Sequence, residues 1–163
     1  MRIRNCQLQD AQQICDIYNF YVENTTITFE EVPVSVEEMA RRIDAYTKLC
    51  AWFVCEVDGV LVGYAYATKW KERSAYKLTV ETTVYIRNNL SGKGYGKALY
   101  TALLESLRIQ KFHVALGCLA LPNEPSAKLH EFFGFEKVAH YAEVGRKFNR
   151  WVDVGYWQKI LED

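Results

Sequence analysis

The sequence contains no long hydrophobic run and no excess of charge of either sign. It has 163 residues, with 20 basic and 20 acidic side chains and a formal net charge of zero. Proteins that bind nucleic acids or anionic membranes by general electrostatic attraction carry a basic excess, so we expect neither partner. No apolar stretch is long enough to span a bilayer, and the charged segment from Met1 to Asn5 is followed by no apolar signal core. We therefore expect a cytoplasmic protein.

Cysteine and histidine are sparse, and neither forms a cluster. The chain has three histidines and five cysteines, with no C-x-x-C pair and no group at the spacing of a metal site. We therefore expect no metal. An odd number of cysteines in mostly apolar surroundings is typical of reduced core thiols. These residues are Cys6, Cys15, Cys50, Cys55 and Cys118.

The sequence also has no linker, internal repeat or low-complexity stretch. Half of its residues are hydrophobic, which is typical of a globular chain and not of a disordered one. The length is enough for one domain that buries most of its apolar surface. We expect residues 1–163 to form a single domain.

The hydrophobic pattern predicts strands and helices in mixed order. Asp10 is expected to cap the first helix, Ser35 and Glu38 to form a capping box for the second, and Gly134 to end the last. Asp58-Gly59 predicts a hairpin turn. Strands are expected at 2–7, 52–57, 60–67, 77–87, 113–119, 135–144 and 151–160, helices from 10 and from 35 and at 94–110 and 122–133, a short extended segment at 27–29, and a connection across 145–150. This order predicts an α/β fold with a mixed central β-sheet and helices on both faces.

The stretch from residue 80 to residue 100 organises the rest of the chain. It begins with β-branched and aromatic residues, becomes glycine-rich at residues 92–96, and continues with Leu99, Leu103 and Leu107 on one helical face. A strand, a glycine-rich turn and a helix in this order present free backbone amides at the positive end of the helix dipole. Such a place binds phosphate.

Two common phosphate-binding signatures are not matched. A P-loop requires Ser or Thr after the Gly-Lys pair, but Ala98 follows Gly96-Lys97, and Ser91 stands where the first glycine belongs. A dinucleotide fingerprint that starts at Gly92 would require glycine in place of Lys97. The remaining pattern is G-x-G-x-G ahead of an amphipathic helix. Without further support, a glycine-rich turn that binds no ligand is a common alternative.

This pattern resembles the pyrophosphate loop of the GCN5-related N-acetyltransferases (GNAT). Ser91 occupies the place where that family usually has Arg or Gln. Nearly the whole chain is similar to the phosphinothricin acetyltransferase branch of the family. The matching segments are Thr28-Phe29-Glu30, the residues 70–76, 81–85, 121–126 and 130–135, and Trp151 to Gln158. The resemblance implies the GNAT fold and an acetyl-CoA co-substrate, with a homodimer as the usual assembly.

The resemblance also implies roles for particular residues. Glu81 would be the general base and His130 the acid that protonates the leaving sulfur. The expected contacts to acetyl-CoA are Val84, Tyr85, Ile86, Ser91, Gly92, Lys93, Gly94, Tyr95, Gly96, Lys97, Asn123 and Ser126. The expected contacts to the acceptor are Phe29, Lys71, Arg73, Tyr76, Thr83 and Tyr100. Structural alternatives stay open: Glu81 facing solvent or pairing with Lys77, His130 covering a helix surface, Asn123 and Ser126 as helix caps, and residues 70–76 as a solvated charged loop beside core aromatics.

The predicted function is direct acetyl transfer to the amine of a small amino acid or analogue, such as methionine sulfone, methionine sulfoximine or phosphinothricin. No cysteine is next to Glu81 or His130 in the sequence, which argues against an acetyl-cysteine intermediate. Glu30 stands where herbicide-detoxifying members have arginine, which argues against phosphinothricin itself. Two alternatives stay open, namely another amine as acceptor (a polyamine, an antibiotic or a protein) and an acyl-CoA sensor without turnover.

Overall fold

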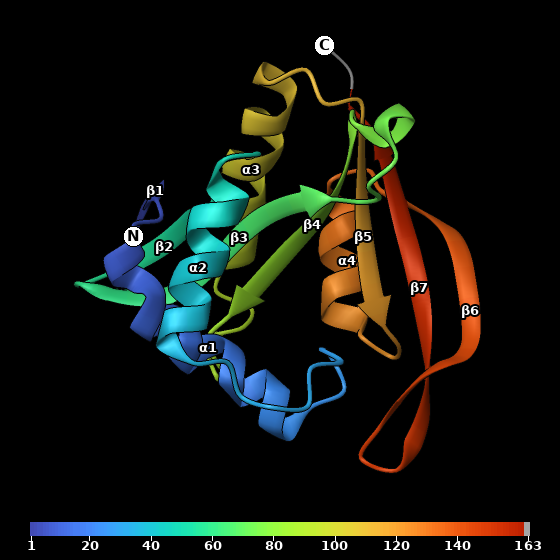
Figure 1. The fold of residues 1–163 in the computed structure, drawn as a ribbon, viewed down its shortest axis with the longest axis horizontal. Coiled ribbons are helices and arrows are strands. Elements are labelled where there is room, and N and C mark those ends of the chain that lie inside the picture. The colour runs from blue at the N-terminus through green and yellow to red at the C-terminus, as the bar shows by residue number, and fades with distance from the viewer. Residues whose placement is uncertain (162–163) are drawn as a thin grey trace.

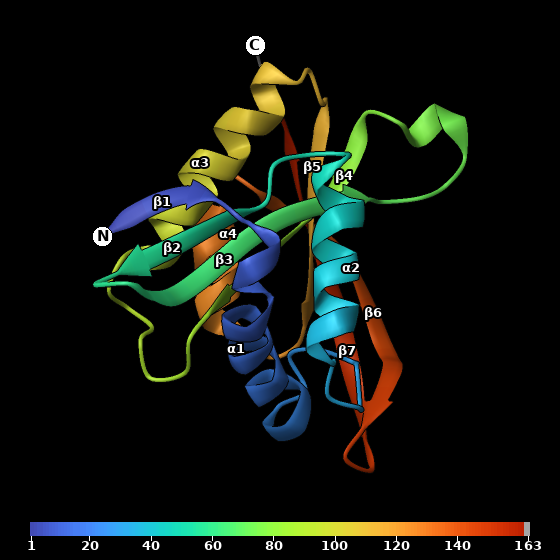
Figure 2. The ribbon, with the colours of Figure 1, turned by 60° about the vertical axis from the view of Figure 1, so that its left-hand side comes forward.

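A computed structural model describes residues 1–161 of the chain (Figure 1). The predicted domain extends to residue 163, so its last two residues lie outside the described part. Seven strands of these 161 residues form one sheet, with helices α1 and α2 on one face and α3 and α4 on the other (Figures 1 and 2). The strands are β1 (Arg2–Asn5), β2 (Phe53–Val57), β3 (Val60–Lys69), β4 (Thr79–Ile86), β5 (Val114–Ala120), β6 (Glu136–Lys147) and β7 (Arg150–Ile160). The helices are α1 (Ala11–Asn24), α2 (Val36–Thr47), α3 (Tyr95–Ile109) and α4 (Glu124–Phe132), with short 3-10 turns at Leu8–Asp10 and Ser74–Tyr76.

The strand order is β1-β2-β3-β4-β5-β7-β6, and β4 with β5 is the parallel pair of the sheet that residues 1–161 form. Their pairing runs from Thr79 opposite Val114 to Thr82 opposite Gly117 and stops there. Beyond this point β4 continues beside β3 alone, and β5 beside β7. The two strands therefore separate and leave a split at the centre of the sheet (Figure 1).

Each face of the sheet has its own hydrophobic core. Leu99, Leu103 and Leu107 of α3 are fully buried, which confirms the predicted apolar face. On the other face, α1 and α2 bury a second cluster around Trp52 and Tyr64. Burying a leucine side chain contributes about 1.5–3 kcal/mol, so α3 is fixed firmly under the split.

The connections differ from the sequence prediction at two places. Residues 27–29 were expected to be extended, but the chain forms a bend at residues 26–28. Strands β6 and β7 were expected to join across residues 145–150, yet the turn consists of Phe148 and Asn149, both with positive φ. Asn tolerates this conformation, whereas Phe gives no turn signal in a sequence. Asp58 and Gly59 form the predicted hairpin, also with positive φ.

The predicted caps are confirmed only in part. The Ser35 hydroxyl accepts a hydrogen bond from the Glu38 amide, as expected, but the Glu38 carboxylate pairs with Arg41 and Arg42 and closes no box. The Asp10 carboxylate does not cap α1. It instead accepts hydrogen bonds from the Arg4 guanidinium at 2.8 and 2.9 Å and from the Gln7 amide at 2.8 Å. A charged donor is the stronger partner for a buried carboxylate, so Arg4 decides its direction.

We expect Asp10→Asn to lower the free energy of unfolding at pH 7 by about 1.5–3 kcal/mol, because it removes hydrogen bonds between charged groups. Burial would raise the pKa of Asp10, but the bonds from Arg4 and Gln7 outweigh it and lower the pKa. This stability is therefore present above the unfolded pKa, near 3.9, and is lost as the pH falls through the lower folded value. Urea denaturation at several pH values measures it. An equal difference between the two proteins at pH 7 and at strongly acidic pH would contradict the assignment.

Candidate active site

A cavity of about 1100 Å³ lies at the split between β4 and β5. Its walls come from the ends of these two strands, the first turn of α3, the start of α4, and the segment that follows α1. Backbone groups of β4 beyond Thr82 have no partner on β5, because the parallel pairing has ended. The cavity therefore offers both side chains and unpaired strand backbone.

The glycine-rich turn delivers the N-terminus of α3 to this cavity. Gly92 and Gly94 have φ of +80° and +85°, a conformation that favours glycine. Gly94 caps α3 without a side-chain bond, and the amides of Tyr95, Gly96 and Lys97 bond to no other group of residues 1–161. Gly96 does not need positive φ, and a Cβ there would only contact Leu129. Three free amides and a helix dipole therefore face the cavity, which suits an anion such as pyrophosphate.

The predicted acetyl-CoA residues gather around this cavity, with one exception. Lys93 belongs to the turn but does not line the wall. Asn123 caps α4 by accepting a hydrogen bond from the Ser126 amide, so the predicted cap and a place in the cavity wall coexist. Of the predicted acetyl-CoA contacts, those that line the cavity are Val84, Tyr85, Ile86, Ser91, Gly92, Gly94, Tyr95, Gly96, Lys97, Asn123 and Ser126.

Glu81 lies on β4 just before the split and lines the cavity. Because side chains alternate along a strand, Glu81 and Thr83 share one face of the sheet and Thr82 the other. Within residues 1–161 the carboxylate has neither a hydrogen bond nor an ion pair, so the alternative pairing with Lys77 is not formed. Burial raises the pKa of Glu81 above its ordinary value. An unpaired carboxylate with a raised pKa is suited to accept a proton near neutral pH.

His130 lines the cavity but directs both ring nitrogens into the protein. Nδ1 lies 2.7 Å from the Ser126 carbonyl oxygen and Nε2 lies 2.7 Å from the Tyr100 hydroxyl. A carbonyl only accepts, so Nδ1 carries the proton and Nε2 of the neutral ring accepts from Tyr100. Burial lowers the pKa of His130 despite the Ser126 carbonyl and Glu131. In this arrangement both ring nitrogens have partners within the protein, and neither has an N–H free toward the cavity.

Tyr100 is also placed differently from the prediction. It is fully buried on α3, with its hydroxyl 2.6 Å from Thr82 Oγ1 and bonded to His130, and it does not line the cavity. Direct contact with an acceptor is therefore excluded by its position behind His130. Gly117 on β5 faces the His130 ring, and a Cβ at position 117 would overlap that ring. The sequence pattern could not distinguish a residue buried behind the cavity wall, such as Tyr100, from one that lines the cavity.

The predicted acceptor residues divide into two groups. Phe29 and Thr83 line the cavity. Lys71, Arg73 and Tyr76 do not, because they lie on the loop between β3 and β4. The Lys71 ammonium is 4.5 Å from the centre of the Trp70 ring, and Trp70 packs edge-on against Tyr76. The loop thus forms its own aromatic cluster.

Tyr21 and Cys118 are among the cavity residues that were not identified from the sequence. Tyr21 of α1 donates a hydrogen bond from its hydroxyl to the Ile86 carbonyl oxygen at 2.6 Å. Cys118 of β5 lines the cavity although no cysteine is close to Glu81 or His130 in the sequence. Burial raises the pKa of this thiol, although Tyr156 opposes the shift, so the reactive thiolate is disfavoured. Only the strand register could have indicated its position, because the pairing with β4 ends at Gly117 and Cys118 is the first residue of β5 beyond it.

The sequence matches the family model described as "Acetyltransferase (GNAT) domain" over residues 3–155. The phosphinothricin N-acetyltransferase of Streptomyces viridochromogenes is 38% identical, with 99% of this chain and 88% of that protein covered. The L-methionine sulfoximine/L-methionine sulfone acetyltransferase of Pseudomonas paraeruginosa is 35% identical, with 98% and 94% covered.

Solved structures show the same fold and the ligand. An acetyltransferase of Salmonella typhimurium, solved with acetyl-CoA, is 31% identical with a TM-score of 0.97, and the match covers 100% of this chain and 95% of that one. A phosphinothricin acetyltransferase of Sinorhizobium meliloti in complex with acetyl-CoA is 32% identical with a TM-score of 0.95 and coverage of 98% and 88%. The predicted mixed sheet and fold are confirmed. The chain belongs to the GNAT acetyltransferase family.

Proposed function

We propose that this acetyltransferase transfers the acetyl group of acetyl-CoA to the α-amine of a small amino acid or amino-acid analogue. One observation carries the proposal: the unpaired carboxylate of Glu81 and the free amides of α3 face the same cavity. A relative of similar length is named for methionine sulfoximine and methionine sulfone, and another for phosphinothricin. Acetyl-CoA supplies the acyl group.

In the proposed reaction the amine nitrogen forms a bond to the acetyl carbon while the carbon–sulfur bond breaks. Glu81 accepts the proton that the amine must lose, directly or through a water molecule. The unpaired amides of β4 beside the split stabilise negative charge on the acetyl oxygen. The thiolate, with an ordinary thiol pKa of about 8.5, leaves as such and takes its proton from water. No protein-bound intermediate is required.

The residues at the start of α3 and α4 hold the acyl donor. Backbone amides from Tyr95 to Lys97 bind the pyrophosphate, and Asn123 and Ser126 contact the arm that leads to the thioester. His130 acts as a positioning residue, because its bond to Tyr100 ties α4 to α3, while the Ser126 carbonyl on the same helix fixes its ring. Its substitution is therefore expected to cost less activity than that of Glu81.

The acceptor lies against Thr83 and Phe29. We keep Lys71, Arg73 and Tyr76 as proposed contacts farther out, where Arg73 suits an acidic group on the acceptor. The loop that carries these three residues also contains Trp70, which interacts with the Tyr156 hydroxyl. Tyr156 on β7 is paired with Cys118 of the cavity wall, so the loop is connected to that wall. Arg73→Ala tests this proposal with two acceptors. The variant should have a lower kcat/KM than the wild type with an amino acid, and an unchanged kcat/KM with an amine that has no carboxylate.

We further propose that the protein works in the cytoplasm as a homodimer. All five cysteines are free thiols, which fits a reducing compartment. Among residues 1–161, no helix is long and apolar enough to cross a membrane. Strand β6 is the edge of the described sheet, and Val138, Tyr141, Val144 and the neighbouring Trp151 are all more than half exposed there. Exposed apolar side chains at a sheet edge offer a surface that a second copy of the chain can cover.

Glu81→Gln should lower kcat/KM with an amino-acid acceptor by about 10³- to 10⁴-fold, because it removes the base and keeps the shape. In the wild type, activity should fall as the pH drops through the raised pKa of Glu81, and this acidic limb should be missing in the variant. Stability at pH 7 should not decrease, since burial disfavours the charge that Gln removes. The measurements are CoA release over pH with a panel of amines, and urea denaturation. A variant with more than half the wild-type rate and an intact limb would show that the base is elsewhere.

Gly94→Ala should raise the KM for acetyl-CoA about tenfold, because a side chain at positive φ costs roughly 1–2 kcal/mol and shifts the free amides. Gly59→Ala is the matched control. It has φ of +80° and open space around its Cα, as Gly94 has, but it lies in the β2–β3 turn. Both variants should lose similar stability, and only Gly94→Ala should lose acetyl-CoA affinity. Equal KM values in the two variants would remove the phosphate-loop assignment.

Val144→Lys should weaken dimerisation at least tenfold, which corresponds to about 1.4 kcal/mol, since it places a charge in the proposed interface. Val60→Lys is the control, because Val60 is half exposed at the far hairpin between β2 and β3. The molar mass of the wild type and of both variants is measured by light scattering after size-exclusion chromatography at several protein concentrations. A monomeric wild-type protein, or equal dissociation in both variants, is the result that argues against an interface on β6.

A further inference from the structure

The wall of the cavity on the acceptor side is made by a segment without regular structure. Residues 25–34, which we name the acceptor loop, connect α1 to α2 and contain no helix or strand. Ile27, Thr28 and Phe29 of this loop line the cavity. A ten-residue loop without a backbone ladder has no conformation of its own, so side chains from other elements must fix it.

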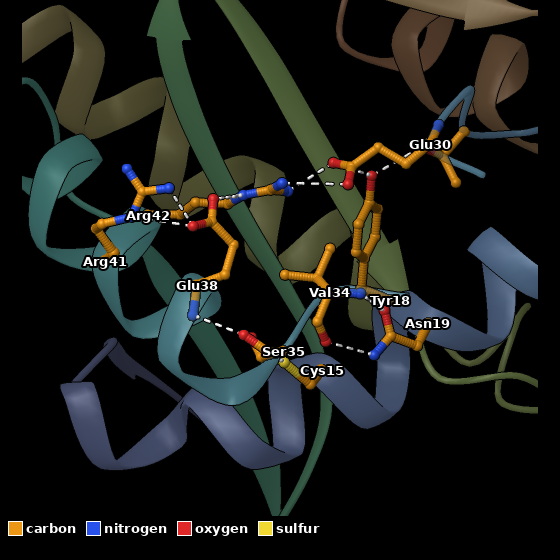
Figure 3. A network of polar contacts seen from close by, with 10 residues as sticks. Cys15, Tyr18, Asn19, Glu30, Val34, Ser35, Glu38, Arg41 and Arg42 are labelled. Carbon is orange, nitrogen blue, oxygen red and sulfur yellow. Dashed lines mark hydrogen bonds and ion pairs between the residues drawn. The ribbon is translucent and has the colours of Figure 1, made fainter. Parts of the chain in front are cut away.

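One set of contacts comes from α1 and α2 (Figure 3). The Tyr18 hydroxyl lies 2.8 Å from the Thr28 hydroxyl and donates to Glu30 at 3.0 Å. Arg42 forms two hydrogen bonds to the Glu30 carboxylate, at 2.6 and 3.1 Å. Glu30 is thus compensated by Arg42 and does not line the cavity. Its negative charge is therefore compensated within the protein and does not face the cavity.

The other contact comes from the β6–β7 hairpin and involves a buried charge. Lys147 is 2% exposed, and its ammonium donates to the Thr28 carbonyl oxygen at 2.8 Å. It forms no ion pair with any carboxylate of residues 1–161. Desolvation lowers the pKa of Lys147 although Glu31 and Glu30 act against it. A buried ammonium without a paired carboxylate is costly, so a neutral side chain would serve the fold better.

The same hairpin also touches the next residue of the loop. The backbone at Gly145 lies so close to Phe29 that a Cβ at position 145 would overlap the aromatic ring. Arg150 adds a hydrogen bond to the Thr26 hydroxyl at 3.2 Å. Three points of the hairpin therefore contact three residues around the cavity end of the loop.

We propose that Lys147 is a positioning residue for the acceptor: its ammonium holds the Thr28 carbonyl so that Thr28 and Phe29 form a rigid wall against the side chain of the amino acid. The inference rests on the proposed function. Lys147 does not line the cavity and therefore acts through Thr28. The charge is kept because a hydrogen bond from an ammonium is about twice as strong as one from a neutral donor.

The proposal predicts a separation of the two substrates. Lys147→Met removes the donor at nearly equal length and should raise the KM for L-methionine sulfone about tenfold, with the KM for acetyl-CoA within about twofold of wild type. Lys147→Gln restores a neutral donor and should recover part of the loss. Lys137→Met is the matched control on the same strand, since Lys137 is exposed and contacts His140 and the Trp157 ring, away from the loop.

Two further measurements keep the outcome clear. Hydrogen exchange of the amides at residues 26–31 should accelerate about tenfold in Lys147→Met and not in Lys137→Met, whether or not an acceptor is known. Gly145→Ala should also raise the acceptor KM, because it displaces Phe29 and leaves Lys147 in place. The proposal is overturned if exchange is unchanged in Lys147→Met, or if its two KM values rise together. A wild-type enzyme that acetylates no amino acid but shows the exchange difference would instead contradict the proposed substrate.

Discussion

A chain of hydrogen bonds holds the sheet together at the point where it opens. It runs from His130 on α4 to Tyr100 on α3, then to Thr82 on β4 and the Leu116 carbonyl on β5. Thr82 and Gly117 are also the last paired residues of the parallel strands. The buried network therefore fixes the vertex of the split, and the positions of both cavity walls depend on it. Tyr100 donates its hydrogen to the neutral His130 ring, and the one hydrogen of the Thr82 hydroxyl is shared between the Tyr100 oxygen and the Leu116 carbonyl oxygen.

The active site combines two features that a stable fold would normally avoid. The amides at the start of α3 have no partner, and Glu81 is partly desolvated without a counter-ion. Each of these costs stability, and each becomes favourable only when a substrate supplies the missing charge or proton. The large hydrophobic cores on the two faces of the sheet offset this cost. The cavity can thus remain chemically unsatisfied while the scaffold stays rigid.

Local signals predicted most of the elements well. The glycines at 92 and 94 and the leucine face of α3 are close together in the sequence, and both glycines line the cavity. Residues that act through tertiary contacts were not predictable in this way. Tyr100 has the composition of a pocket residue, yet it is buried behind His130. Asp10 has a capping sequence, but its carboxylate binds Arg4 on the neighbouring strand β1 instead. Lys147 and Thr28, which are hydrogen-bonded, lie 119 positions apart in the sequence. Glu30 could be interpreted only after Arg42 was located beside it.

The two substrates are recognised by different kinds of information. In the proposed reaction the donor is bound by peptide amides whose positions are set by the fold, so its binding should depend little on the side chains near them. The acceptor is met by a short loop whose shape depends on a few anchoring side chains. Substitutions of those anchoring side chains can therefore change which amine is accepted without changing the affinity for acetyl-CoA. In this architecture the acceptor site can diverge between related proteins while the acetyl-CoA site stays the same.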